Sequence, residues 1–286
     1  MKRIVFLSGK GGTGKTTLAA AFASRVDNLT IVDADVDAAN LHLVFHPQVE
    51  ETGVYVGSKS AVRDDDRCTS CGTCREACRF GAVDEQMEID PLLCEGCGTC
   101  VTACPTDALR LVECPSGTWY IGRAARHPMV GAELYAGEEV SGKLVSVIKE
   151  KADDLAEAKG TDRIAIDGSP GIGCPVIAST TGTQAAVLVT EPSRSGLHDL
   201  ERILGVVRHF DVPATLIINK ADLSEPLAEE IEAFADREAL PVLGRIPYDD
   251  RVLDALRVGR NPVDDPDSPA GRAMDRAIAC LLERIE

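Results

Sequence analysis

The chain has 286 residues, 44% of them hydrophobic and 27% charged, which is the balance of a globular protein with one large or two modest domains. Its 30 basic and 46 acidic residues leave a formal net charge of −16, which argues against nucleic acid or an anionic membrane as a main partner. No apolar run approaches the ~20 residues of a membrane span, and the first residues lack the pattern of a signal peptide, so we expect a cytoplasmic protein.

Outside residues 44–141, short and continuously apolar segments alternate with segments of helical length. Such segments are typical of strands buried on both faces, so the alternation predicts an α/β fold with a mostly parallel sheet flanked by helices. The predicted strands are Ile4–Leu7, Leu29–Val32, Ile164–Ile166, Ala185–Val189, Thr215–Ile218 and Val242–Ile246. The predicted helices are Lys15–Ser24, Gly142–Ala158, Leu197–Phe210, Pro226–Arg237 and Ala270–Arg284.

The first predicted strand leads into a glycine-rich loop at residues 9–17, which reads GKGGTGKTT. It matches the phosphate-binding pattern G-x-x-x-x-G-K-[ST], which requires a strand before it and a helix after it. Backbone N–H groups and the start of the helix would surround phosphate oxygens, Lys15 would reach the outer phosphates, and the Thr16 hydroxyl would ligate Mg²⁺. The residues expected to contact nucleotide in this loop are Gly11, Gly12, Thr13, Gly14, Lys15, Thr16 and Thr17.

With Lys10 included, this loop resembles the deviant Walker A motif of the MinD/ParA ATPases, which also include the nitrogenase iron protein and the Mrp-type iron–sulfur carriers. The resemblance implies an ATP-dependent homodimer in which Lys10 contacts the phosphates bound by the partner. It also implies, from the segment Ile31–Asp35, that Asp35 orients the attacking water and that Asp33 lies near the metal. The alternative for these two residues is an ordinary helix-capping role.

Further along the chain, Asp167 ends the strand Ile164–Ile166 and matches the Walker B acid of the same family, with a glycine-rich switch after it. By this resemblance, Lys10, Lys15, Asp35 and Asp167 would carry out ATP hydrolysis. The loops expected beside the adenine base contain Asn219, Lys220, Pro247 and Asp249. Because Asn219, Lys220 and Asp222 also resemble the guanine-reading motif of GTPases, GTP stays open as an alternative to ATP.

Eight of the eleven cysteines lie between residues 68 and 104, in two runs of the same spacing, C-x2-C-x2-C-x3-C, offset by 26 residues. The first run is Cys68, Cys71, Cys74 and Cys78, and the second is Cys94, Cys97, Cys100 and Cys104. In such a run three thiolates can hold one face of a cubane, and the fourth serves the other cluster. Zinc or disulfides are the alternatives, but zinc sites usually take two cysteine pairs with a longer spacer.

These two runs resemble the bacterial two-cluster ferredoxins over about 50 residues. The resemblance implies two 4Fe–4S clusters and predicts an α+β insert at residues 61–113, between ATPase segments at 1–60 and 114–286. One cluster would be held by Cys68, Cys71, Cys74 and Cys104. The other would be held by Cys78, Cys94, Cys97 and Cys100. After the insert, we predict a hairpin of Ala108–Glu113 and Thr118–Ile121 around Pro115–Gly117.

The insert is acidic, because residues 64–113 hold eleven acidic and four basic side chains. A redox partner with a basic docking surface is the natural complement, although the same charges also serve solubility. Cys174 occupies the predicted switch, and we interpret it as a small buried residue rather than as a ligand to a cluster shared by two subunits, although Cys114 could join it there. Cys280 and the apolar face of the last helix are expected to pack in the core, since that helix lacks the basic face of a membrane anchor.

The combination of parts favours an ATPase in which nucleotide-dependent dimerisation gates electron transfer through the two clusters. The runner-up is an ATP-dependent assembly or delivery protein for metalloclusters, similar to the Mrp-type carriers. Those carriers present a cysteine pair near the C-terminal end, whereas Cys280 stands alone here. A positioning or partitioning scaffold is the third alternative, and it lacks a visible DNA-binding patch or membrane helix.

Overall fold

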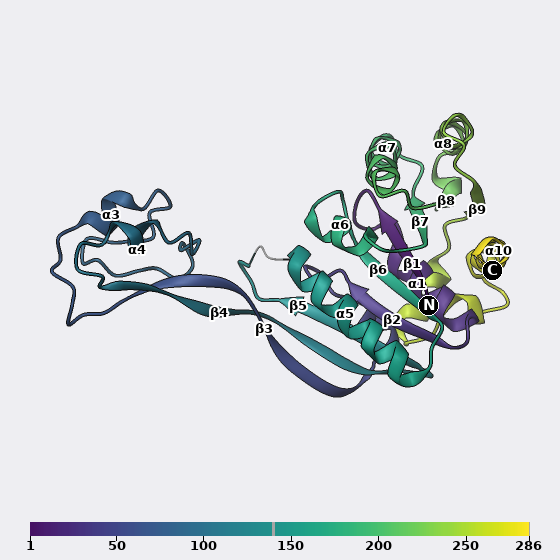
Figure 1. The fold of residues 1–286 in the computed structure, drawn as a ribbon. Coiled ribbons are helices and arrows are strands. Elements are labelled where there is room, and N and C mark those ends of the chain that lie inside the picture. Colours follow the sequence, from purple (N-terminus) through teal and green to yellow (C-terminus); the bar gives the residue numbers. More distant parts are fainter. Residues whose placement is uncertain (139–140, 286) are drawn as a thin grey trace. The chain divides into compact units, whose positions relative to one another are not determined.

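The computed structural model describes residues 1–138 and 141–285, and the described residues form a nine-stranded sheet flanked by helices (Figure 1). The strand order is β3-β4-β5-β2-β6-β1-β7-β8-β9, and the pairings from β5 to β9 are all parallel. The α/β fold with a mostly parallel sheet is therefore confirmed. Among the described residues, no helix has the length and apolar character needed to cross a membrane.

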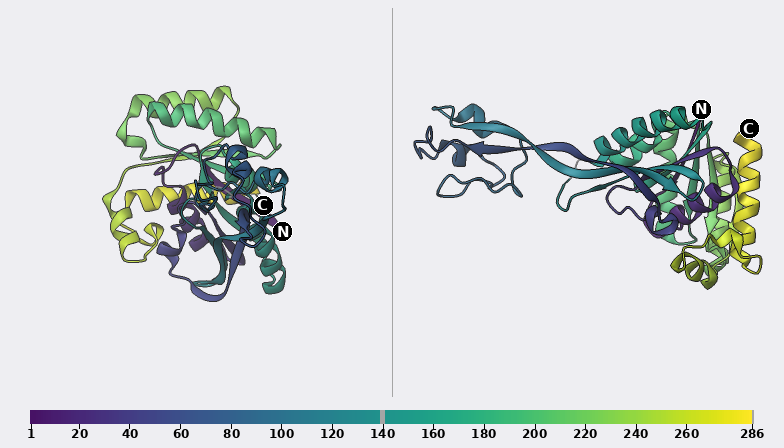
Figure 2. Two further views of the ribbon diagram at one scale, coloured as in Figure 1. Left: turned by 90° about the vertical axis from the view of Figure 1, so that its left-hand side faces the viewer. Right: turned by 90° about the horizontal axis from the view of Figure 1, so that it is seen from below.

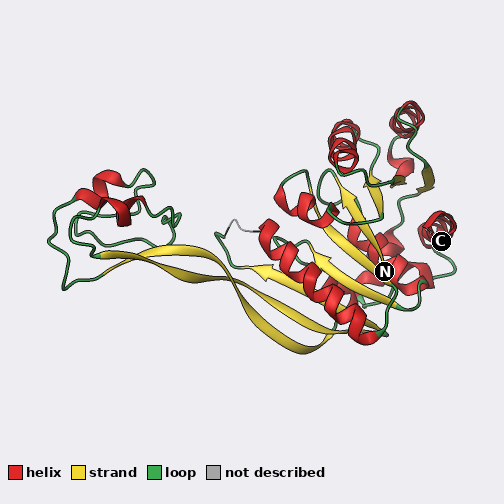
Figure 3. Ribbon diagram, viewed as in Figure 1, coloured by secondary structure: helices red, strands yellow, loops and turns green. Residues whose placement is uncertain are grey.

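The predicted strands and helices are all present, and the structure adds further elements (Figure 3). The strands are β1 Lys2–Ser8, β2 Leu29–Ala34, β3 Gln48–Arg63, β4 Leu109–Ala124, β5 His127–Leu134, β6 Arg163–Pro170, β7 Ala185–Thr190, β8 Ala214–Asn219 and β9 Val242–Ile246. The longer helices are α1 Lys15–Arg25, α5 Ser141–Lys159, α7 Arg194–His209, α8 Glu225–Arg237, α9 Asp250–Arg257 and α10 Pro269–Ile285. The shorter ones are α2 Leu41–Phe45, α3 Thr73–Ala77, α4 Thr99–Ala103 and α6 Cys174–Thr180.

An apolar core under α1 and α10 anchors the sheet beside the glycine-rich loop. Phe6 of β1 and Phe22 of α1 are fully buried, with ring centroids 5.5 Å apart. From α10, Ile278 and Leu281 enter the same core, as the spacing of its apolar residues predicts. Burying a side chain of this size contributes about 1.5–3 kcal/mol, so these contacts hold α1 rigidly behind the loop that precedes it.

The chain divides into two compact units (Figure 2). The first unit comprises residues 1–52, 119–133 and 141–286, and it contains the parallel strands. The second comprises residues 53–118 and 134–140, and the predicted insert at 61–113 falls within it. The two long strands β3 and β4 each begin in one unit and end in the other.

The hairpin predicted around Pro115–Gly117 is wrong, because β4 continues through these residues without a turn. The side chain of the fully buried Ser116 explains this continuity. Its hydroxyl oxygen accepts hydrogen bonds from the N–H groups of Gly57 (3.2 Å) and Ser58 (3.0 Å) on β3. The Ser116 hydroxyl thus replaces backbone hydrogen bonds between β3 and β4 next to Pro115, which has no N–H group of its own. The chain turns instead at residues 125–126, where Ala125 has a positive φ of 52°.

We predict that Ser116→Ala destabilises the second unit, because the substitution leaves the half-buried N–H groups of Gly57 and Ser58 on β3 without an acceptor. The expected loss in the free energy of unfolding is about 1–3 kcal/mol, measured by chemical denaturation. Thr118→Ala, at an exposed position of the same strand, is the matched control and should change stability little. Equal stability of both variants would show that Ser116 does not hold β4 in place.

Candidate functional site

The nucleotide residues predicted from the sequence come together around a cavity of about 510 Å³ in the first unit. The loop between β1 and α1 forms its floor, and the segments after β2, β8 and β9 form its walls. The predicted residues that line it are Gly11, Gly12, Thr13, Gly14, Lys15, Thr16, Thr17, Asp35, Asn219, Lys220, Pro247 and Asp249. These segments end parallel strands, and ligands of open α/β sheets bind at that edge.

A buried ammonium group is the centre of this cavity's charge. Lys15 Nζ lies 2.6 Å from Asp167 Oδ1 and 3.6 Å from Asp35 Oδ2. Burial disfavours the charge of Lys15, but the carboxylates of Asp167 and Asp35 outweigh it and raise the pKa of Lys15. The Thr16 hydroxyl donates a 2.6 Å hydrogen bond to Asp167 Oδ2. The structure therefore brings together three of the four predicted catalytic residues, Lys15, Asp35 and Asp167.

Carboxylates outnumber cations at this centre. Asp33 is fully buried, and its pKa is raised, first by burial and then by the nearby charge of Asp167. Burial likewise raises the pKa of Asp35 to about 6. Three carboxylates around one ammonium suit a site that takes up Mg²⁺ together with a phosphate chain, since the metal supplies the missing positive charge.

Two buried polar atoms near this cavity lack a hydrogen-bond partner among the described residues, namely Thr13 Oγ1 and Asn40 Oδ1. Both residues line the cavity, so a bound ligand can satisfy them. At Gly14, φ is +93° and a Cβ would lie 2.2 Å from the Asn219 amide nitrogen, so only glycine fits there. The loop is therefore shaped for close approach of a ligand to its backbone.

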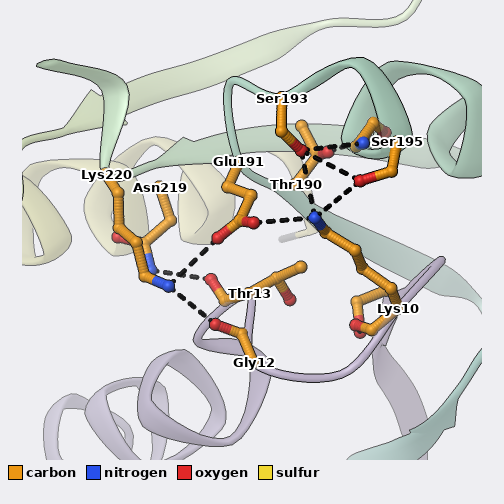
Figure 4. A network of polar contacts seen from close by, with 11 residues as sticks. Lys10, Gly12, Thr13, Thr190, Glu191, Ser193, Ser195, Asn219 and Lys220 are labelled. Carbon is orange, nitrogen blue, oxygen red and sulfur yellow. Dashed lines mark hydrogen bonds and ion pairs between the residues drawn. The ribbon is translucent and has the colours of Figure 1, made fainter. Parts of the chain in front are cut away.

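Lys10 does not line the cavity and instead binds within its own chain (Figure 4). Its Nζ lies 2.7 Å from Glu191 Oε1, and the Ser193 and Ser195 hydroxyls are 3.0 and 2.9 Å away. Lys220 Nζ lies 3.0 Å from the other oxygen of Glu191 and donates to the Gly12 carbonyl at 2.8 Å. One carboxylate is thus shared by two lysines.

Burial would raise the pKa of Glu191, but hydrogen bonds from Lys10 and Lys220 overcome that effect and lower it, so the carboxylate stays ionised. Asn219 braces the loop as well, because its amide donates to the Thr13 carbonyl at 2.7 Å. Asn219 and Lys220, predicted to lie beside the base, thus also position the phosphate loop. Sequence reasoning missed Glu191, whose only signal is its place directly after the strand β7.

The far wall of the cavity is apolar and comes from α9 and α10. Val252, Leu253 and Leu256 of α9 line it together with Met274 of α10. The sequence analysis missed α9, although apolar residues one and four apart are a helical signal. Asp249 caps this helix by accepting from the N–H of Arg251 at 3.0 Å, so its carboxylate has a structural task.

The eight clustered cysteines line two further cavities in the second unit, four to each. One cavity is lined by Cys68, Cys71, Cys74 and Cys104. The other is lined by Cys78, Cys94, Cys97 and Cys100. The fourth cysteine of each run therefore crosses to the cavity of the other run. Four thiolates are the donor set of a 4Fe–4S cluster, so the residues present fit that group.

The two cavities are built by the same local geometry, 26 residues apart. Gly72 and Gly98 have φ values of 80° and 76° and precede the short helices α3 and α4. Cys71 Sγ lies 3.3 Å from the Thr73 hydroxyl, and Cys97 Sγ lies 3.4 Å from the hydroxyl of the matching threonine. These hydroxyl contacts lower the pKa of both thiols, which favours the thiolate form that ligates metal.

Backbone N–H groups also point at sulfur: Ala61 donates to Cys94 Sγ at 3.4 Å and Ala108 donates to Cys104 Sγ at 3.3 Å. Such donors tune the potential of a cluster. Across the described ranges, no group of three or more His, Cys, Asp or Glu side chains is close enough to hold a single metal ion. In a cubane each thiolate ligates a different iron, so its four sulfurs stand further apart than around one ion.

The remaining cysteines correct two predictions. Cys174 is exposed at the start of α6, so the interpretation of a buried switch residue is wrong. Cys280 is also exposed, because α10 turns its core face through Ala277 and Leu281 and leaves position 280 outside. Cys114 is half-buried in β4, and its thiol lies 3.8 Å from the carbonyl oxygen of Val112.

Comparisons with known proteins match most of the chain. The family described as "CobQ/CobB/MinD/ParA nucleotide binding domain" matches residues 4–263. An uncharacterised protein of Methanocaldococcus jannaschii is 33% identical over 225 residues, which cover 78% of this chain and 79% of that protein. An iron–sulfur cluster carrier protein of Pyrococcus furiosus is 24% identical over 303 residues, which cover 99% of this chain and 86% of that protein.

Among solved structures, the septum site-determining protein MinD of Pyrococcus horikoshii OT3, complexed with Mg-ADP, has the same fold. The TM-score is 0.58 at 19% identity, and the match covers 97% of this chain and 94% of that one.

We predict that the protein, purified without oxygen, holds about eight iron and eight sulfide per chain, as two cubanes require. Cys71→Ser should lower the iron content to about four, because one cavity loses a ligand. Cys114→Ser is the matched control, and it should keep all eight iron, since Cys114 lines neither cavity. Metal analysis that finds one or two zinc ions and no iron would refute the cluster assignment.

Proposed function

Because this chain belongs to the CobQ/CobB/MinD/ParA nucleotide-binding family, we propose that it hydrolyses Mg–ATP and that its nucleotide state gates electron transfer through two 4Fe–4S clusters. The observation that carries this proposal is the pairing of two kinds of site in one chain. The first unit has a cavity lined by the glycine-rich loop and by the buried Lys15, whose ammonium group faces the carboxylates of Asp35 and Asp167. The second has two cavities with four cysteines each.

In hydrolysis, Lys15 and the backbone of the glycine-rich loop bind the phosphate chain and stabilise the charge that develops on it. Thr16 and the carboxylates beside it hold Mg²⁺, and Asp35 orients the attacking water. The raised pKa of Asp35, about 6, is consistent with a group that can accept a proton near neutral pH. These roles are what the family resemblance implies, and the place of Lys15, Thr16 and Asp35 in the cavity lining supports them.

ATP is the proposed nucleotide rather than GTP. A guanine-reading Asp222 would have to face the cavity, but Asp222 is not among the residues that line it, and its Oδ1 accepts a 2.6 Å hydrogen bond from the Tyr248 N–H. The wall formed by Val252, Leu253 and Leu256 is apolar and accommodates the flat face of a base without reading its edge. These contacts favour adenine over guanine as the base that the cavity binds.

Dimerisation is proposed to depend on Lys10. The lysine would leave Glu191 and bind the phosphates held by a second copy, which carry more negative charge than one carboxylate. The exchange is favourable only when ATP is bound, because the competing carboxylate of Glu191 holds Lys10 at 2.7 Å in the structure. Glu191 is therefore proposed to oppose dimerisation.

When bound by the eight cysteines of the second unit, the two clusters would each accept and donate one electron. Two exposed leucines precede Cys94 of the second cavity: Leu92 is 86% exposed and Leu93 is 48% exposed. Exposed acidic residues, including Asp90 and Glu88, flank them. An apolar centre with an acidic rim suits a redox partner that carries a basic docking surface.

Cluster assembly or delivery is the second candidate, and the similarity to a protein named as an iron–sulfur cluster carrier favours it. A labile cluster bridging two subunits needs exposed thiols from each chain. Cys174 and Cys280 are exposed, but each stands apart in sequence from any other cysteine of the first unit. Electron transfer therefore remains the leading proposal.

We predict opposite effects of two substitutions on ATP-dependent dimers. Lys10→Ala should keep nucleotide binding and lose dimerisation, because Lys10 does not line the cavity of its own chain. Glu191→Gln should strengthen the dimer several-fold, because the neutral amide no longer holds Lys10 as an ion pair. Analytical ultracentrifugation with a non-hydrolysable ATP analogue measures both. Dimers of Lys10→Ala equal to those of the parent would remove Lys10 from the interface.

Coupling between nucleotide and clusters is tested by redox titration. With an ATP analogue in place of ADP, we expect the midpoint potential of at least one cluster to shift by tens of millivolts. A coupling free energy of about 1–3 kcal/mol is common, and ~59 mV corresponds to 1.4 kcal/mol for one electron. Identical potentials, together with identical rates to a basic partner, would favour the delivery function.

A further inference from the structure

Tyr120 of β4 has a buried hydroxyl group with no hydrogen-bond partner among the described residues. Its ring packs against the apolar core under α1, in the first unit. A buried hydroxyl without a partner costs about 1–3 kcal/mol, and a phenylalanine would fill the same space without that cost. We therefore expect the hydroxyl group of Tyr120 to have a role other than packing.

Gly131 of β5 shows where this hydroxyl lies. A Cβ at Gly131 would be 2.4 Å from the Tyr120 oxygen and from the ring carbon that carries it. The ring thus occupies the space that a side chain at position 131 would take. Gly131 is in register with Asp33 on the neighbouring strand β2.

Side chains in register on neighbouring parallel strands point to the same face of a sheet, with the strands about 4.8 Å apart. The Tyr120 hydroxyl therefore lies beside Asp33, and Asp33 is in register with Asp167 on β6. The absence of a side chain at Gly131 is what lets the phenol reach across a whole strand toward the carboxylates of the nucleotide site.

Asp33 holds the segment that carries Asp35. Its Oδ2 accepts from the N–H of Leu41 at 3.0 Å, and its Oδ1 accepts from the N–H of Asp35 at 3.3 Å. A carboxylate has about four lone-pair positions, so Asp33 can accept a further hydrogen bond. Burial and the carboxylate of Asp33 raise the pKa of Tyr120, so its hydroxyl keeps its proton and is a donor.

We propose that Tyr120 is a positioning residue of the ATPase site: in the Mg–nucleotide complex its hydroxyl donates a hydrogen bond to Asp33 and so orients the segment of Asp35. Lys15 now faces Asp167 and Asp35, and on binding it turns its charge to the phosphates. The positive charge of Lys15 then stabilises the carboxylates less than before. A hydrogen bond from a neutral donor to Asp33 therefore contributes more to stabilising that carboxylate. This inference rests on ATP hydrolysis by the chain.

Tyr120→Phe tests it, because the substitution removes one oxygen and keeps the ring over Gly131. We expect kcat for ATP hydrolysis to fall about three- to ten-fold, with KM for Mg–ATP within two-fold of the parent and a melting temperature no lower than that of the parent. A role in packing alone would not separate kcat from KM in this way. Tyr135→Phe, which removes the hydroxyl of a tyrosine that is 42% exposed, is the control and should match the parent.

A kcat equal to that of the parent would overturn the inference and leave the proposed function intact. A fall in kcat accompanied by a lower melting temperature or a higher KM would also overturn it, because the hydroxyl would then support folding or nucleotide binding. A parent protein without ATPase activity would refute the proposed function, and the inference with it.

Discussion

One buried ammonium group faces three buried carboxylates, and this imbalance of charge governs the nucleotide site. Lys15 binds Asp167 closely and Asp35 at longer range, and Asp33 lies in register beside Asp167. Burying carboxylates is costly unless positive charge accompanies them, which is why burial raises the pKa of Asp33 and Asp35. A bound metal ion would supply positive charge beside these carboxylates. The site is therefore expected to bind Mg²⁺ together with its nucleotide.

The glycine-rich loop is held from outside as well as from its own helix. Asn219 and Lys220, at the end of β8, bind the carbonyls of Thr13 and Gly12. Glu191, at the end of β7, joins Lys220 to Lys10. The loop therefore depends on three parallel strands at once, and the packing of α1 against Phe6 supports it from behind. A loop preorganised in this way loses little entropy when phosphate binds.

The cysteine unit follows a different principle, in which a local pattern is used twice. The same turn with a left-handed glycine, the same threonine hydroxyl and the same short helix recur after 26 residues. Each run sends its last cysteine to the other cavity, so neither cavity is complete without both runs. The strands β3 and β4 each run from one unit into the other, and Tyr120 lies on the part of β4 that belongs to the first unit, so the proposed coupling of the two kinds of site has a covalent route.

The sequence by itself determined the strands β1, β2, β6, β7, β8 and β9, the helices α1, α5, α7, α8 and α10, the phosphate loop and the two cysteine runs, because each is signalled by residues close together in the chain. Only the tertiary structure decided that β4 passes Ser116 without turning, that Lys10 binds Glu191, and that Cys174 and Cys280 face solvent. It also decided that the Tyr120 ring occupies the space left by the missing side chain of Gly131, which is in register with Asp33. These features depend on residues up to 181 positions apart, as Lys10 and Glu191 are. Strand order and register bring such residues together, and no local pattern encodes either one.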